Sequence, residues 1–137
     1  MRRRRLAVAA ITVTALLVAV LTAACHPGTS TSSIREMATC SPSGTNLRIV
    51  AQNLRFDRDC LAAPAGQAFI LTLDNEENGI PHNVSIYPNG ERSNALFKGE
   101  IVTGVQSTAY QVHALPAGTY FFQCDVHPDM NGAFVVA

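Results

Sequence analysis

Short runs rich in Val, Ile, Phe, Tyr and Thr recur along the chain after residue 45, and turn-forming residues separate them. Runs of this kind, bounded by Gly, Pro, Asn and Asp, are typical of the strands of a β-sandwich or β-barrel. The expected strands span residues 46–51, 67–75, 82–87, 95–102, 108–112, 119–124 and 132–136. Residues 61–63 and 93–95 are expected to form one helical turn at most. No segment after residue 24 repeats apolar residues at helical spacing, so the sequence predicts an all-β domain over residues 40–137.

The chain begins with a segment of a different kind. Arginines at positions 2–5 precede an uncharged apolar run over residues 6–24, which ends in small residues before Cys25. This pattern is typical of an export signal, so we expect residues 1–24 to be a signal peptide. Residues 21–25 also resemble the lipobox of bacterial lipoproteins, in which the Cys after the cut carries lipid. Two alternatives stay open: an uncut segment long enough to span a bilayer, and a secreted protein with a free Cys25. All three place the domain outside the cytoplasm.

Residues 25–39 are rich in Ser and Thr, include Pro27 and Gly28 and show no apolar periodicity, which predicts a flexible tether between the anchor and the domain. The whole chain has ten basic and ten acidic side chains, but four of the basic ones lie in the leader. The exported chain would therefore keep six basic and ten acidic side chains, a net charge of −4. This balance argues against binding to nucleic acid.

The residues with the clearest chemistry form the stretch Cys124-Asp125-Val126-His127-Pro128-Asp129-Met130. The stretch offers a thiolate, an imidazole and a thioether at C-x2-H-x2-M spacing, at the end of an expected strand. Soft sulfur ligands with imidazole favour copper, and two His, one Cys and a weak axial Met are typical of a blue-copper electron-transfer centre. This hypothesis needs a second histidine, and His82 is the candidate because it begins the expected strand 82–87.

Alternation predicts where these side chains point, since residues two apart on a strand share a face. Cys124 shares a face with Phe122, and His82 shares one with Val84, so we expect both ligands to leave strand ends on an apolar face. Asn83, next to His82, is expected to support the ligands through hydrogen bonds.

Two carboxylates and a proline accompany the ligands of this loop. Asp125 and Asp129 would favour the more positive Cu(II) state and a basic partner. Pro128 limits the loop and helps to keep His127 at the surface.

The remaining cysteines, Cys40 and Cys60, lie in an expected oxidising compartment, where two such residues are expected to pair. Closing a loop of this length would stabilise the fold by about 3 kcal/mol. The alternative is that one of them is a buried free thiol. A structural zinc site is not expected, because no His lies beside either residue.

Residues 46–136 resemble a cupredoxin of the plastocyanin and amicyanin group, in the segments 75–84, 115–124 and 124–134. The resemblance implies an eight-stranded Greek-key sandwich that binds one copper ion. It implies equatorial ligation by His82, Cys124 and His127, and axial ligation by Met130.

By the same resemblance, the exposed edge of His127 would pass the electron, ringed by apolar residues such as Ile80, Pro81 and Pro128. Only two residues separate His127 from Met130. This short loop resembles amicyanin and departs from the plastocyanin pattern.

The expected function is single-electron transport between redox partner proteins, by a monomer held at the membrane through lipid on Cys25. An enzyme is not expected, because the chain lacks the His-x-His array of a multicopper oxidase, a second Cys near Cys124 for a binuclear centre, and a recognisable Ser, His and Asp motif. The main alternative is a copper-handling protein that delivers the ion with the same four ligands. The intact ligand set argues against a third option, a surface module with an idle metal site. His113 is expected to be a surface residue.

Overall fold

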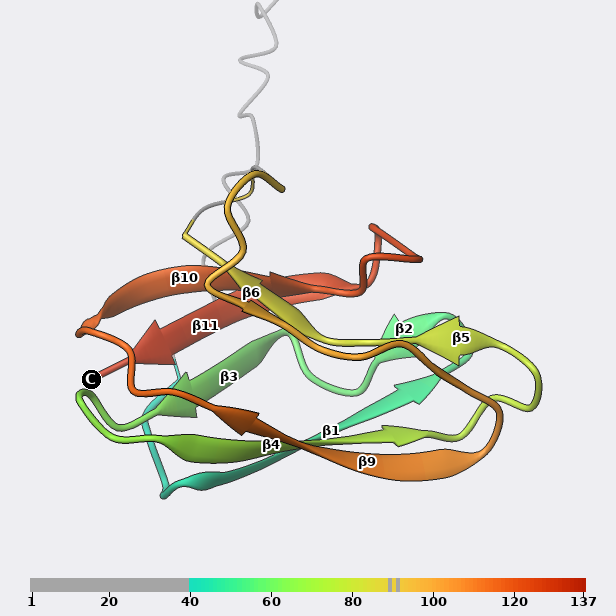
Figure 1. Ribbon diagram of the computed structural model, residues 1–137, viewed down its shortest axis with the longest axis horizontal. Helices are drawn as coiled ribbons and strands as arrows, with labels where there is room; N and C mark the ends of the chain where they lie inside the picture. Colours follow the sequence, from blue (N-terminus) through green and yellow to red (C-terminus); the bar gives the residue numbers. More distant parts are fainter. Residues whose placement is uncertain (1–39, 89, 91) are drawn as a thin grey trace, which may run out of the picture. The chain divides into compact units, whose positions relative to one another are not determined.

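The computed structural model describes residues 40–88, 90 and 92–137, which fold as a β-sandwich (Figure 1). One sheet has the strand order β2-β1-β4-β9, a second has the order β3-β11-β10-β6-β7, and a two-stranded ribbon joins β5 to β8. The strands are β1 Asn46–Gln52, β2 Arg55–Phe56, β3 Cys60–Ala63, β4 Phe69–Asn75, β5 Pro81–His82, β6 Ser85–Tyr87, β7 Phe97–Lys98, β8 Val102–Thr103, β9 Gln106–Val112, β10 Gly118–Gln123 and β11 Asn131–Val136. The predicted all-β fold is confirmed, with more and shorter strands than the eight expected.

Three predictions from the sequence lie outside the described residues: the signal peptide over 1–24, the tether over 25–39 and the lipid site at Cys25. Within the part of the chain that the structure describes, no helix is both long and apolar enough to cross a membrane.

The core lies between the two large sheets, and β4 shows how the sequence pattern builds it. Phe69, Leu71 and Leu73 alternate along this strand and are all buried. Complete burial of each such side chain stabilises the folded state by roughly 1.5–3 kcal/mol. Phe69 stacks on Phe134 of β11, with ring centroids 5.5 Å apart, and this contact joins the sheets.

The predicted disulfide between Cys40 and Cys60 is present and ties the first described residue to β3. The two cysteines are 20 residues apart in the sequence. In the chain-entropy model a loop of this length stabilises the fold by about 3 kcal/mol. Among the described cysteines this leaves Cys124, which is free and buried.

The single strand expected over residues 82–87 is wrong. His82 ends β5 and pairs with Val102 of β8, whereas Ser85 begins β6 and pairs with Gln123 of β10. Between these strands the chain passes from the ribbon to the large sheet, and every residue from 82 to 87 is buried. This crossing places His82 at the edge of the sandwich next to the end of β10.

The strand expected over residues 95–102 is also wrong, because only the short strands β7 and β8 lie in that region. Gly99, between them, donates its N–H to the Val84 carbonyl at 3.1 Å. A Cβ at Gly99 would lie 2.5 Å from the same oxygen, so the close approach requires glycine.

The helical turn expected over residues 61–63 is wrong as well. These residues belong to β3, which pairs in parallel with β11. The two-residue strand β2 was not predicted either; it pairs with β1 through the turn formed by Asn53 and Leu54.

Candidate metal centre

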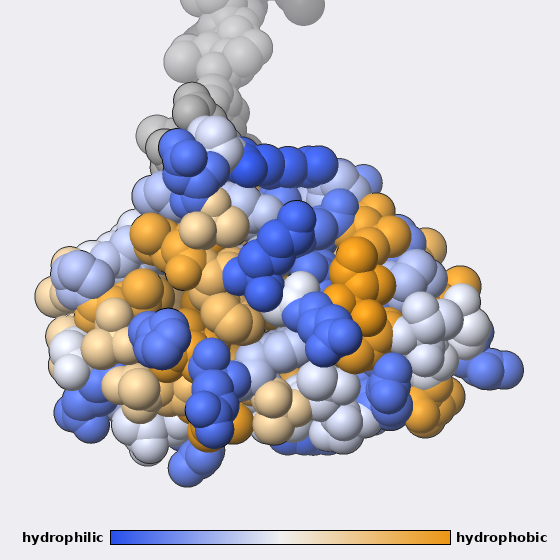
Figure 2. Space-filling model, in the orientation of Figure 1, coloured by the Kyte–Doolittle hydropathy of each residue, from blue (hydrophilic) through white to orange (hydrophobic). Residues whose placement is uncertain are grey.

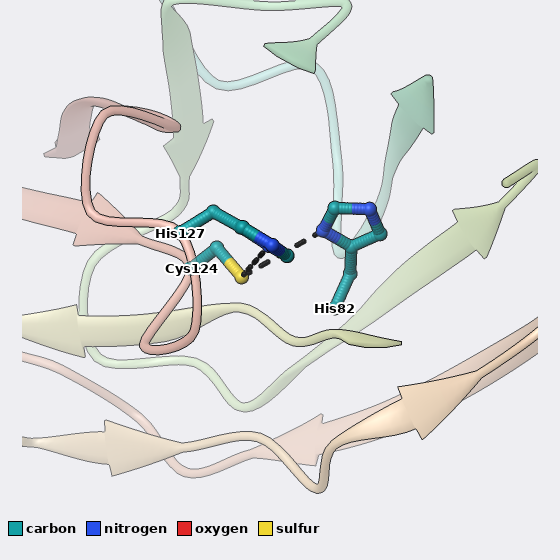
Figure 3. A group of neighbouring side chains, drawn as sticks. All are labelled: His82, Cys124 and His127. Carbon is teal, nitrogen blue, oxygen red and sulfur yellow. Dashed lines mark hydrogen bonds between the residues drawn. The ribbon is translucent and has the colours of Figure 1, made fainter. Parts of the chain in front are cut away.

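Three predicted ligands converge at one end of the sandwich. Cys124 follows β10, His127 lies in the loop between β10 and β11, and His82 ends β5. The Cys124 Sγ atom lies 3.8 Å from Nδ1 of His82 and 3.8 Å from Nδ1 of His127 (Figure 3). The two imidazole rings are tilted by 49°, with centroids 4.8 Å apart. His82 lies 42 positions before Cys124 in the sequence, yet the three donor atoms all lie within 4.8 Å of one another.

These donors fit a single metal ion. Metal–nitrogen bonds of about 2.0 Å and metal–sulfur bonds of about 2.3 Å are usual in protein sites, and atoms bound to one ion at those lengths lie close to 3.8 Å apart. A thiolate with two imidazoles is a soft donor set that suits copper or zinc. His82 and Cys124 are completely buried, whereas His127 is half-buried and reaches the surface.

The loop that carries Cys124 and His127 is closed by its own backbone. The Cys124 N–H donates to the Met130 carbonyl, and the Met130 N–H donates to the His127 carbonyl, each at 2.9 Å. The side chain of Asn131 donates to the Pro128 carbonyl, also at 2.9 Å. Met130 is 2% exposed, so its thioether lies inside the protein at the end of this loop. The loop thus holds its ligand atoms through hydrogen bonds that do not depend on a metal.

A carboxylate that the sequence did not single out contacts His82 on the other side of its ring. The Nε2 atom of His82 lies 2.8 Å from Oε2 of Glu77, in the loop between β4 and β5. Burial lowers the pKa of His82 below the usual range and outweighs the opposite effect of Glu77, so the imidazole stays neutral. A neutral imidazole that donates from Nε2 keeps a lone pair on Nδ1, the atom that faces Cys124.

Burial by itself would raise the pKa of Glu77, but other contacts outweigh this effect, and its pKa lies below the usual range. These contacts are the hydrogen bonds from the Leu54 backbone N–H and from the His82 side chain. Glu77 is therefore an anion at neutral pH. Glu77 lies in a polar run that predicts only a turn. The sequence hints at its role only through its place five residues before His82.

Asn83 and Asp125 connect the loop to β5 and β6. The Asn83 side-chain amide donates to the Asp125 carboxylate at 2.8 Å and to the Gly99 carbonyl at 2.9 Å. Its oxygen accepts the backbone N–H of Asp125, at 2.8 Å. The same carboxylate accepts the hydroxyl of Ser85 at 2.7 Å and that of Tyr87 at 2.6 Å. The Asn83 side chain thus holds Asp125, the residue next to Cys124, through hydrogen bonds to its carboxylate and its backbone.

Burial would raise the pKa of Asp125, but the hydrogen bonds from Tyr87, Asn83 and Ser85 and the charge of Lys98 together lower it. Asp125 is therefore ionised and fixed, whereas Asp129, in the same loop, is exposed. His113 is exposed as predicted and lies outside the cluster.

The comparison with known families agrees with this architecture. The family model described as "Cupredoxin-like domain" matches residues 12–136. The chain belongs to this family. No curated protein matches the sequence significantly.

Solved structures of cupredoxins have the same fold. An auracyanin from Roseiflexus castenholzii is 23% identical with a TM-score of 0.61, over 68% of this chain and 97% of that one. Auracyanin A from Chloroflexus aurantiacus, described as a "blue" copper protein, is 21% identical with a TM-score of 0.61, over 69% and 99% of the two chains. Amicyanin from Paracoccus versutus is 26% identical with a TM-score of 0.51, over 67% and 81%.

Proposed function

We propose that this cupredoxin-like domain binds one copper ion through His82, Cys124, His127 and Met130, and carries single electrons between redox proteins outside the cytoplasm. The observation that carries the proposal is the convergence of Cys124 Sγ with the Nδ1 atoms of two histidines, beside a buried methionine. Two imidazoles, a thiolate and a weak thioether are the donor set of blue-copper electron-transfer sites. When bound, copper would supply a one-electron redox couple.

The hydrogen bonds of the loop explain how the chain would favour electron transfer. The backbone of Met130 is bonded to both Cys124 and His127, and Asp125 is bonded to Asn83. Donor atoms held in this way need not move when the charge of the site changes, so the reorganisation cost stays low. The burial of His82 and Cys124 keeps water away from the same atoms.

His127 and exposed apolar residues would form the docking surface for the redox partner. Val126 precedes His127, and Ile101 and Val105 flank β8, the strand that pairs with the His82 strand; all three are between 37% and 69% exposed. On the face drawn in Figure 2, hydrophobic residues gather in patches on either side of a hydrophilic band. Apolar patches with a polar surround are typical of protein contact sites.

The location rests on the sequence and on one structural feature. The expected signal peptide, the lipobox resemblance at Cys25 and the disulfide between Cys40 and Cys60 all support an exported, membrane-anchored protein. An electron carrier in that place needs a partner protein and has no need of a substrate, so we propose a non-enzymatic role.

The alternative, delivery of copper to another exported protein, uses the same four ligands. Delivery requires an ion that a partner can reach and exchange. His82 and Cys124 are both 0% exposed, which favours retention of the ion over its exchange.

An optical titration with Cu(II) tests the proposal. We expect an intense blue thiolate-to-copper band that bleaches reversibly with a reductant. Cys124→Ser should abolish the band, and His113→Asn should leave it intact, because His113 is an exposed histidine outside the cluster. Absence of the band, or rapid loss of copper to a mild chelator, would overturn electron transport in favour of delivery.

A further inference from the structure

The outer nitrogen of His82 contacts one specific carboxylate. Its Nδ1 faces the Cys124 sulfur at 3.8 Å, and its Nε2 lies 2.8 Å from Glu77 Oε2. An ionised carboxylate only accepts hydrogen bonds, so the proton of the ring must be on Nε2. The tautomer of His82 is therefore the one that leaves Nδ1 free to bind a metal ion.

The Glu77 carboxylate is itself held in place from two directions. The backbone N–H of Leu54 donates to the same Oε2 atom at 3.0 Å. The backbone N–H of Glu77 donates to the Asn75 side chain at 3.0 Å, and Asn75 donates in turn to the carbonyls of Ile80 and Val102. Asn75 is 1% exposed. The loop between β4 and β5 thus presents the carboxylate in one orientation.

The turn that aims the Leu54 N–H has an uncommon backbone. Asn53 and Leu54 have φ values of 55° and 54°, in the left-handed region. Two successive residues of this kind fit the twist of a tight β-hairpin, but they are unfavourable for a side chain such as leucine. The chain accepts this conformation at the point where it supplies a second hydrogen bond to Glu77.

We infer that Glu77 is a positioning residue for the metal centre: it fixes the tautomer of His82 and, as an anion bonded to a ligand, favours Cu(II) over Cu(I). This inference rests on the proposed copper function. A carboxylate that accepts the outer N–H of a ligating histidine orients the ring and raises its basicity. The negative charge favours the more positive ion, and the contact is poorly screened because the side chains of His82 and Glu77 are 0% and 15% exposed.

The neighbouring residue provides a matched control. Glu76 carries the same charge one position earlier, but its carboxylate accepts from the exposed side chain of Gln52 and does not contact His82. Glu76→Gln therefore removes a charge from the same loop without changing the ligand. Glu77→Gln removes the charge and keeps an acceptor oxygen, whereas Glu77→Ala removes both.

The first measurement is the reduction potential of the copper-loaded protein by spectroelectrochemical titration. Glu77→Gln should keep the blue band and lose at least tenfold more affinity for Cu(II) than for Cu(I), which raises the potential by at least about 59 mV. Glu76→Gln should raise it far less. An equal rise in both variants, or none in Glu77→Gln, would overturn the inference while the band still supports the electron carrier.

The second measurement uses the metal-free protein and does not depend on copper. Two-bond proton–nitrogen NMR correlations should show His82 as the Nε2–H tautomer alone in the wild type and as a mixture in Glu77→Ala. An unchanged single tautomer in Glu77→Ala would overturn the positioning role. If the wild type formed no blue band, the proposed function would fail, and this measurement would still decide whether Glu77 positions His82.

Discussion

At the scale of single residues, Asp125 connects the metal loop to the sandwich. Its carboxylate accepts hydrogen bonds from Asn83, Ser85 and Tyr87, and all three donors are buried. Asp125→Ala would leave these donors without an acceptor, and we expect it to lower the free energy of unfolding by about 3 kcal/mol. Urea unfolding of the metal-free protein measures this loss.

Asp129→Ala is the control for Asp125→Ala, because Asp129 is an exposed carboxylate in the same loop. It should change the free energy of unfolding by no more than about 0.5 kcal/mol. Equal losses in the two variants would mean that the charge of the loop matters and the buried hydrogen bonds do not.

At the scale of strands, Gly132 limits how β11 can begin after the metal loop. It pairs with Phe122 of β10, and an added Cβ would contact the Asp59 carbonyl and lie 2.6 Å from Phe122 Cζ. Gly132→Ala should therefore cost about 1–3 kcal/mol, as overpacked core sites do. It should also shift the copper band, because Phe122 is two residues before Cys124. Thermal unfolding and the optical spectrum measure the two effects.

Gly118→Ala tests whether the close contact is the cause. Gly118 lies on β10, and a Cβ there would meet only the Tyr120 ring at 3.5 Å, an ordinary contact. We expect this variant to unfold at nearly the wild-type temperature and to keep an unchanged copper band. A comparable loss in both variants would mean that backbone freedom explains the result.

The same strands show how much of the structure the sequence predicts. Alternation gave β1, β4, β9 and β11, because each of these strands buries residues on one face and exposes or half-buries the other. It failed over residues 82–87, where both faces are buried and the pattern cannot reveal a crossing between sheets. It also missed β3, whose short Cys-Leu-Ala-Ala run is poor in the β-branched and aromatic residues that favour strands.

The same limit applies to the candidate site: the sequence shows local patterns, but it does not show contacts that only the fold creates. Cys124, His127 and Met130 were predicted because their spacing is a local motif, and His82 because one more histidine was needed. Glu77 was missed, because only the fold of its loop brings the carboxylate to His82.

At the scale of the whole molecule, Tyr110 joins the two sheets. It lies on β9, its ring packs on Phe97 of β7 with centroids 5.7 Å apart, and its hydroxyl donates to the Glu100 carbonyl at 2.7 Å. Burial, followed by the charges of Glu100 and Cys124, raises the pKa of Tyr110 from 10.0 to about 12. Folding therefore favours the neutral phenol, and this part of the stability is complete below pH 10 and is lost as the pH rises to about 12.

We expect this loss to be roughly 3 kcal/mol for a 7% exposed side chain whose pKa changes by this amount. Tyr110→Phe should be less stable than the wild type by about 1 kcal/mol at pH 8, because the hydrogen bond to Glu100 is missing. At pH 12 the order should reverse, since phenylalanine has no proton to lose while the wild type must bury a phenolate or unfold. Urea unfolding of both proteins at the two pH values measures the difference. If both proteins lost the same free energy of unfolding between pH 8 and pH 12, ionisation of Tyr110 would not be the cause of the loss.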